Sequence, residues 1–195
     1  KVTGESDELI NFHSERIIYD ALQDLKANYS IFQLEGGCAY RVSQKIQPKD
    51  LNDLSAVLAL ARPGGLSFVD QYASNVCDPV HPVVDEVLAE TRGICVYQEQ
   101  VMGMFAKIGF SLEEGELIRR CIGKKDLVKI KDWKVKIYDK CIESNLPKEL
   151  GDLIWKIVSD SAKYQFGKGH SASYSAIAAI LLYYKQKYPT EFYWS

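Results

Sequence analysis

Apolar residues recur three or four positions apart through most of this chain, and short segments rich in glycine or proline interrupt them. This spacing lines up apolar side chains on one face of a helix, and glycine and proline end helices. The pattern predicts a mainly α protein with many helices and one or two short strands. One strand is expected over residues 29–34, which are rich in β-branched and aromatic residues.

The sequence also predicts where the helices begin and end. Ser111-Leu112-Glu113-Glu114 has the form of a capping box, so a central helix should start there and end at Gly123. Residues 164–170 should form a loop bounded by glycine. We expect helices over residues 15–27, 38–46, 51–61, 66–73, 83–91, 98–108, 112–122, 126–144, 147–163 and 171–187.

Composition limits the classes of protein that the chain can belong to. It has 195 residues, 47% hydrophobic and 26% charged, which is ordinary for a globular protein with one large or two small domains. The net charge of -2 gives no global basic field, so a nucleic-acid surface would have to be local. No apolar run is long enough to cross a bilayer, and the five cysteines lack metal-binding spacing. We therefore expect no membrane partner, reduced thiols and a cytoplasmic location.

A cluster of cations marks the end of the predicted central helix. Side chains four apart on a helix share a face, so Arg120 and Lys124 point the same way if the helix persists that far. Forked guanidinium donors and lysine charges together suit phosphate. A solvated helix end is the alternative explanation. The cluster consists of Arg119, Arg120, Lys124 and Lys125.

The glycine-rich segment before the last long helix is a second candidate for binding phosphate. Its glycines allow close backbone approach, and the helix that follows offers unpaired N–H groups to an anion. Lys168 adds charge and His170 adds a titratable donor, although the spacing is not that of a Walker loop. A turn that simply links two helices is the alternative.

Two weaker candidates lie earlier in the chain. Arg62 sits in a rigid Pro-Gly turn that can expose its guanidinium, and an ordinary surface turn would look the same. Gln98 and Gln100 carry amides suited to nucleic-acid contacts, and a polar helix turn explains them equally well.

The groups that catalyse phosphoryl transfer are missing from the sequence. Two Mg²⁺ ions need carboxylates held close together on strands or loops, and the acidic residues here lie singly on predicted helix faces. No Walker loop, nucleophile elbow or zinc site occurs. We therefore assign no catalytic residue and no metal ligand, and expect that this chain alone is not a complete enzyme.

Six stretches follow one another along the chain in a recognisable order. They are Phe32-Gln33-Leu34-Glu35, Arg62-Pro63-Gly64, Tyr97-Gln98-Glu99-Gln100-Val101-Met102, Arg119-Arg120 with Gly123-Lys124-Lys125, Phe166 to Tyr174, and Lys187-Tyr188-Pro189 with Glu191-Phe192. Together they resemble successive motifs of the bacterial replicative C-family DNA polymerases, the DNA polymerase III alpha subunits. The similarity extends from about Ser14 to the end of the chain.

The resemblance implies a role for each candidate residue. In that family this segment is the fingers region, which binds the incoming deoxynucleoside triphosphate and primer-template DNA for template-directed nucleotidyl transfer in DNA replication. Secondary nucleotide or DNA contacts would come from Arg62, Gln98, Gln100, Ser171 and Tyr174. The triphosphate ligands would be Arg119, Arg120, Lys124, Lys125, Lys168 and His170.

The resemblance also implies what lies outside the chain. The catalytic aspartates and the Mg²⁺ that they hold would belong to a palm domain, so the chain should be part of a DNA-directed DNA polymerase and inactive by itself. Its start at Lys1 fits a fragment or a processed product. Other replisome subunits, such as a sliding clamp, would be partners.

Departures from the family motifs indicate a divergent member. Gly36 stands where the family usually has serine, Gly65 replaces a proline, and Gly167 and Gly169 replace polar residues beside Lys168. A non-catalytic helical module for DNA binding or subunit docking, built on the same scaffold, is the alternative function. For domains we expect a lead-in over residues 1–13 and a fingers domain over 14–195 that can divide in two near 76–93.

Overall fold

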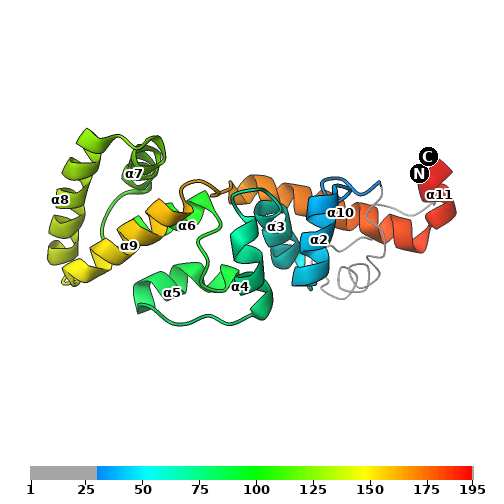
Figure 1. The fold of residues 1–195 in the computed structure, drawn as a ribbon, viewed down its shortest axis with the longest axis horizontal. Coiled ribbons are helices and arrows are strands. Elements are labelled where there is room, and N and C mark those ends of the chain that lie inside the picture. Colours follow the sequence, from blue (N-terminus) through cyan, green and yellow to red (C-terminus); the bar gives the residue numbers. More distant parts are fainter. Residues whose placement is uncertain (1–29, 195) are drawn as a thin grey trace. The chain divides into compact units, whose positions relative to one another are not determined.

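The computed structural model describes residues 30–194, which are almost entirely helical (Figure 1). The mainly α fold predicted from the sequence is confirmed. The predicted lead-in over residues 1–13 and helix over 15–27 lie outside the described residues. The elements are α2 (Gly37–Ile46), α3 (Leu51–Leu60), η2 (Leu66–Phe68), α4 (Val69–Ser74), α5 (Pro82–Leu88), η3 (Ala89–Thr91), α6 (Gln98–Lys107), α7 (Leu112–Lys124), α8 (Leu127–Glu143), α9 (Lys148–Ser161), α10 (Lys168–Lys187) and α11 (Pro189–Trp194).

The chain divides into two compact units. Unit 1 comprises residues 1–73 and 169–195, and unit 2 comprises residues 74–168. Each unit is therefore built largely from helices that follow one another in the chain, except that α10 and α11 join the early helices in unit 1. The predicted fingers domain over 14–195, with its junction near 76–93, stays a prediction.

The expected strand over residues 29–34 is wrong in the part that the structure describes. Residues 30–34 form turns, because Ser30 and Gln33 have positive φ angles of 63° and 65°. The backbone N–H groups of Leu34 and Glu35 both donate to the carbonyl oxygen of Ile31, so the hydrogen bonds are local. Ile31 and Leu34, three residues apart, are fully buried, and this spacing belongs to a helical turn rather than to a strand.

Unit 2 has its own hydrophobic core. The buried side chains come from α5 through α9, with Phe105 at the centre and Phe110 edge-on to it at 6.0 Å between ring centroids. Two backbone hydrogen bonds tie the end of this unit to residues 96–98, since Phe166 N donates to Val96 O and Gln98 N donates to Phe166 O. They form an isolated parallel bridge between Tyr97 and Phe166.

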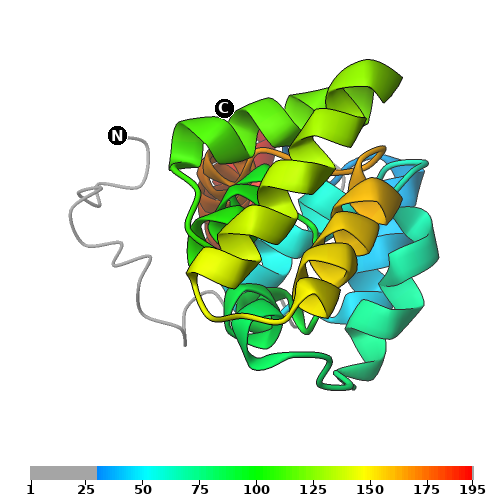
Figure 2. The same ribbon diagram turned by 90° about the vertical axis from the view of Figure 1, so that its left-hand side faces the viewer.

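Within unit 2, α6 and α7 pack closely against each other, as do α8 and α9 (Figure 2). Gly115 makes the first of these contacts possible, because a Cβ there would lie 3.2 Å from Met102 Cα. The predicted capping box at the start of α7 is confirmed. Ser111 Oγ accepts from Glu114 N at 3.2 Å, and Glu114 Oε2 accepts from Ser111 N at 2.9 Å.

Unit 1 buries polar side chains as hydrogen-bonded pairs. Tyr72 donates its hydroxyl hydrogen to Asp53 Oδ1 at 3.0 Å, and both side chains are buried. Ser55 Oγ donates to Ser171 Oγ at 2.8 Å, and Ser171 Oγ donates back to Ser55 O at 2.7 Å. These bonds fix the start of α10 against α3 inside unit 1, because buried polar groups are stable only when paired.

Among the helix ends that differ from the sequence prediction, two affect candidate residues. Helix α7 passes through Gly123 and ends at Lys124, with Lys125 as a left-handed cap at φ 54°. Helix α10 begins at Lys168 rather than at Ser171, so Lys168 and His170 lie in its first turn and not in a loop.

Among the helices of residues 30–194, none has the length and apolar character needed to cross a membrane.

Candidate functional site

Arg119 and Arg120 share one carboxylate on α7. Glu116 accepts two hydrogen bonds from Arg119, at 2.6 Å from Nε and 2.7 Å from Nη2, and one from Arg120 Nε at 2.6 Å. The helix dictates this arrangement, because positions three and four residues after Glu116 lie on the same face. The paired arginines predicted from the sequence are thus brought together, and a single acidic residue orients both.

The charged groups in this cluster shift one another's pKa values. The hydrogen bonds from Arg119 lower the pKa of Glu116 to about 2, burial opposes this shift, and the hydrogen bond from Arg120 adds a smaller lowering. Hydrogen bonding to Glu116 in turn raises the pKa of Arg119, with the charges of Glu116 and Glu99 contributing. Arg119 is half-buried, with 20% of its side chain exposed, whereas Arg120 is 65% exposed.

Lys124 and Lys125 lie at the exposed end of the same helix. Because α7 continues to Lys124, this lysine lies one turn beyond Arg120 on the same face, as the sequence analysis expected for a persistent helix. The carbonyl end of a helix carries partial negative charge, which these cations complement. The last two turns of α7 and its cap therefore carry four cations, of which Arg119 and Arg120 are paired with Glu116.

Lys168 is held by two carboxylates of unit 2. Its Nζ donates to Glu90 Oε2 at 2.5 Å, and its backbone N–H donates to Glu99 Oε2 at 2.9 Å. Glu99 thus caps the first turn of α10, where backbone N–H groups have no partner within the helix.

Glu99 also connects the two basic segments that the sequence analysis singled out. Its oxygen accepts from the Lys168 N–H, and its charge contributes to the raised pKa of Arg119. Within unit 2, Arg119 and the backbone N–H of Lys168 are therefore both near the charge of Glu99, although the two residues lie far apart in the sequence. Lys168 Nζ is itself paired with Glu90, so its charge is balanced by carboxylates of unit 2.

The two glutamines in the first turn of α6 have different surroundings. Gln100 is 3% exposed, and its Oε1 accepts from the backbone N–H groups of Val96 and Tyr97, both at 2.9 Å. Its Nε2 donates to Thr91 Oγ1 at 2.6 Å. A ligand contact through Gln100 would first have to break these bonds, so the structure favours a supporting role for it. Gln98 is partly exposed and remains a candidate contact.

Unit 1 places the other candidates from α10 in an aromatic cluster. The ring of His170 lies 4.1 Å from that of Tyr174, edge-on, and Phe32 lies 5.0 Å from Tyr174 between centroids. The motif that begins at Phe32 thus meets the motif that ends at Tyr174. Ser171 is fully buried and bonded to Ser55, so it supports this cluster rather than offering a free hydroxyl.

Arg62 is tied to the turn that contains it. Its Nε donates to Ala59 O at 3.1 Å, and burial lowers the pKa of its guanidinium. Gly65, which departs from the family motif, fits a close approach here, because a Cβ would lie 2.8 Å from Leu60 O. The predicted turn over residues 62–65 is confirmed, while its contact with a ligand stays a prediction.

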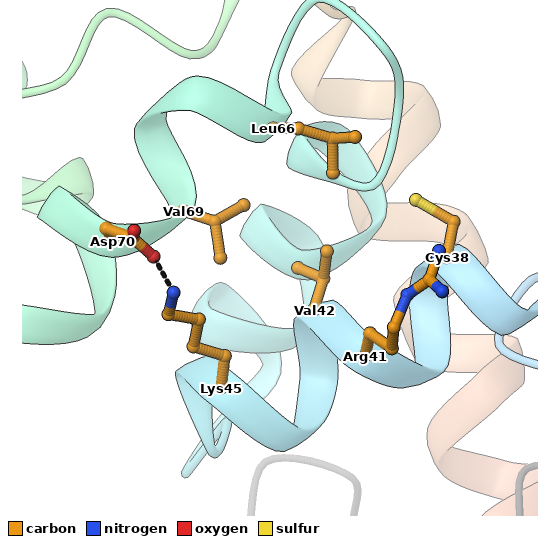
Figure 3. A pocket seen from close by; sticks show the side chains of 7 residues that line it. All are labelled: Cys38, Arg41, Val42, Lys45, Leu66, Val69 and Asp70. Carbon is orange, nitrogen blue, oxygen red and sulfur yellow. Dashed lines mark ion pairs between the residues drawn. The ribbon is translucent and has the colours of Figure 1, made fainter.

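Unit 1 also contains a cavity of about 250 Å³ between α2 and α4 (Figure 3). Its apolar side is formed by Val42, Leu66 and Val69, and an ion pair between Lys45 and Asp70 closes one edge. Arg41 lies at the opposite edge, beside Cys38. Across residues 30–194, no cluster of three or more histidine, cysteine or acidic residues is placed to hold a metal ion.

The comparison with known families identifies the class of protein. The profile of the bacterial DNA polymerase III alpha subunit finger domain matches residues 9–145. The chain belongs to this family, which confirms the resemblance seen in its motifs.

Individual relatives extend the similarity over most of the chain. The DNA polymerase III subunit alpha of Treponema pallidum is 34% identical over 169 residues, which are 84% of this chain and 14% of that protein. The subunit of Aquifex aeolicus is 36% identical over 184 residues, 90% of this chain and 16% of the relative. The subunit of Staphylococcus epidermidis is 32% identical over 200 residues, which are 97% of this chain and 19% of that protein. The chain therefore spans less than a fifth of the length of these curated relatives.

The sequence analysis missed the acidic residues of the site. Glu116 could have been found, because its spacing of three and four residues to the two arginines is the usual spacing of helical ion pairs. Glu90 and Glu99 gave no such signal, since their partner Lys168 is 78 and 69 residues away.

Proposed function

We propose that this chain forms the fingers of a DNA-directed DNA polymerase and binds the triphosphate of the incoming deoxynucleotide beside primer-template DNA. The observation that carries the proposal is the pair of guanidiniums of Arg119 and Arg120, oriented on one helix face by Glu116. Oriented guanidiniums bind phosphate oxygens with two parallel hydrogen bonds, which gives both strength and geometry.

Each remaining candidate has a part in this proposal. Lys124 and Lys125 add charge at the end of α7. On the strength of the family resemblance, Lys168 and His170 are proposed as further triphosphate ligands, and Tyr174 as a secondary contact. Positioned cations would stabilise the negative charge that develops on the transferred phosphoryl group.

The chemical step and the other partners belong to the rest of the polymerase. The Mg²⁺ ions would be held by aspartates of a palm domain outside this chain and would activate the primer end and the phosphate. The palm and replisome subunits such as a sliding clamp are proposed as partners, and the chain by itself should be inactive.

The test is binding of primed DNA to the chain, with and without the matched nucleotide and Mg²⁺, across a salt series. The matched nucleotide should tighten binding, and the Arg119→Ala/Arg120→Ala variant should lose that gain. A Lys131→Ala/Lys156→Ala variant removes two exposed charges of unit 2 and should keep the gain. In the intact polymerase, Arg119→Ala should weaken nucleotide use by about 2 kcal/mol or more.

A different result would favour the alternative function. A non-catalytic module for DNA binding or subunit docking would bind DNA with a steep salt dependence and no response to nucleotide. It would then lose similar affinity for each cation removed, whether arginine or lysine, because only phosphate neutralisation would matter.

A further inference from the structure

We infer that Glu116 is a positioning residue, whose carboxylate sets the guanidiniums of Arg119 and Arg120 in the geometry that receives a triphosphate. The inference rests on the proposed function and adds to it a negatively charged residue, opposite in charge to the arginines that would bind the triphosphate. Glu116 would touch neither nucleotide nor DNA and would act only through the two arginines.

The hydrogen-bond pattern leaves the arginines able to bind an anion. A guanidinium has five N–H donors, and Glu116 takes one from Nε and one from Nη2 of Arg119 but only the Nε donor of Arg120. The Nη1 edge of Arg119 and both terminal nitrogens of Arg120 have no hydrogen bond to the described residues. A phosphate could therefore dock on these edges without displacing Glu116.

The scaffold under Glu116 is rigid. Its neighbour Gly115 packs against the backbone of Met102, and Ile118 is fully buried in the core of unit 2. The capping box at Ser111 and Glu114 fixes the first turn of the same helix. Because the backbone of Glu116 is held in place, its hydrogen bonds restrict the long arginine side chains before any ligand arrives. Restricting them beforehand lowers the entropy lost on binding.

The charge balance also fits a positioning role. Glu116 shares one negative charge between the two positive charges of Arg119 and Arg120, so this pair keeps a net positive charge that attracts an anion. Glu116 remains ionised at neutral pH, because the hydrogen bonds from Arg119 lower its pKa to about 2. Glu116 could instead occupy the position of the phosphate, so that the nucleotide would have to displace it. In that case removing its charge should strengthen nucleotide binding, whereas a positioning role predicts weaker binding.

The experiment measures steady-state kinetics of the full-length polymerase that contains this chain, with matched nucleotide and primed DNA. Glu116→Gln should raise the KM for nucleotide about tenfold, since oriented charge-assisted contacts are lost, with a smaller change in kcat. Glu116→Asp, which keeps the charge, should restore part of the loss. Glu143→Gln is the matched control, because Glu143 pairs with Lys140 at the same helical spacing on α8.

A second background separates positioning from a general effect on folding. In the Arg119→Ala/Arg120→Ala variant, Glu116→Gln should change KM no further, since the groups that it positions are gone. A lower KM for Glu116→Gln would overturn the inference in favour of a displaced carboxylate. An equal loss in both backgrounds would overturn it in favour of a folding role. If the Arg119→Ala/Arg120→Ala variant keeps a normal KM for nucleotide, the proposed function itself is refuted. This result can be told apart from the two results that overturn only the role of Glu116.

Discussion

Glu99 Oε2 accepts a hydrogen bond from the backbone N–H of Lys168 at 2.9 Å and thereby joins α6 to the first turn of α10. The two residues are 69 positions apart in the chain. The same carboxylate contributes to the raised pKa of Arg119 on α7. A single acidic side chain therefore accepts a hydrogen bond from one of the basic segments identified in the sequence and acts through its charge on the other.

Replacing Glu99 by alanine should destabilise the start of α10. The variant loses a charged cap at a helix N-terminus, and we expect the free energy of unfolding to fall by about 1 kcal/mol. Hydrogen exchange of the Lys168 amide should accelerate. Glu86→Ala is the control, because it breaks an exposed ion pair with Lys107 and should change stability by less than about 0.5 kcal/mol. Equal exchange rates in the two variants would contradict the capping role.

Replacing Gln100 by leucine should be strongly destabilising. Leucine fills a similar volume but leaves the buried N–H groups of Val96 and Tyr97 without their acceptor. We expect a loss of about 2–3 kcal/mol in urea unfolding, since unpaired buried donors are costly. Gln98→Leu, at a partly exposed position nearby, should change stability by less than about 0.5 kcal/mol. Similar losses in both would show that the hydrogen bonds of Gln100 are unimportant.

Two glycines of α7 should respond to alanine with opposite signs. A Cβ at Gly115 would lie 3.2 Å from Met102 Cα, a backbone atom that cannot easily move, so Gly115→Ala should lose about 1–2 kcal/mol. A Cβ at Gly123 meets nothing within 4 Å, so Gly123→Ala should gain up to about 1 kcal/mol of helix stability. Thermal unfolding of both variants tests the pair, and a loss at Gly123 would mean that its surroundings are tighter than described.

The stability contributed by Glu116 should depend on pH. Because its pKa is lowered from 4.5 to about 2 by hydrogen bonds from Arg119, the folded state favours the charged carboxylate. The contribution is therefore present above pH 4.5 and disappears as the pH falls towards 2. The pair is partly exposed, so we expect at most about 1 kcal/mol. Urea unfolding of wild type and Glu116→Gln should differ at pH 6 and converge near pH 2; a constant difference would refute the linkage.

Most helices were predicted correctly from the sequence, because the spacing of apolar residues and the helix caps involve only residues that are close together in the chain. The capping box at Ser111 and the proline turn after Arg62 lie where the sequence placed them. Gly123 misled the prediction, since an exposed glycine weakens a helix without ending it when the buried Ile122 holds the last turn. Residues 30–34 looked like a strand, but no neighbouring strand is available to them in the described residues.

The candidate site was predictable only on its basic side. Arg119 and Arg120 lie together in the sequence and in space, whereas the link from Arg119 to Lys168 depends on Glu99, which comes from another helix. Gln100 looked like a polar contact because a buried amide and an exposed one have the same sequence signature. Only the fold shows that its hydrogen bonds go to Val96 and Tyr97.

The close crossing at Gly115 has a mechanical consequence. Helices α6 and α7 touch there with Gly115 against the backbone of Met102, and no side chain lies between the two helices at that point. Glu99 and Arg119 therefore lie on helices that should move together as one body within unit 2. A ligand that pulls on Arg119 would move α6 along with α7, without either helix changing its own shape.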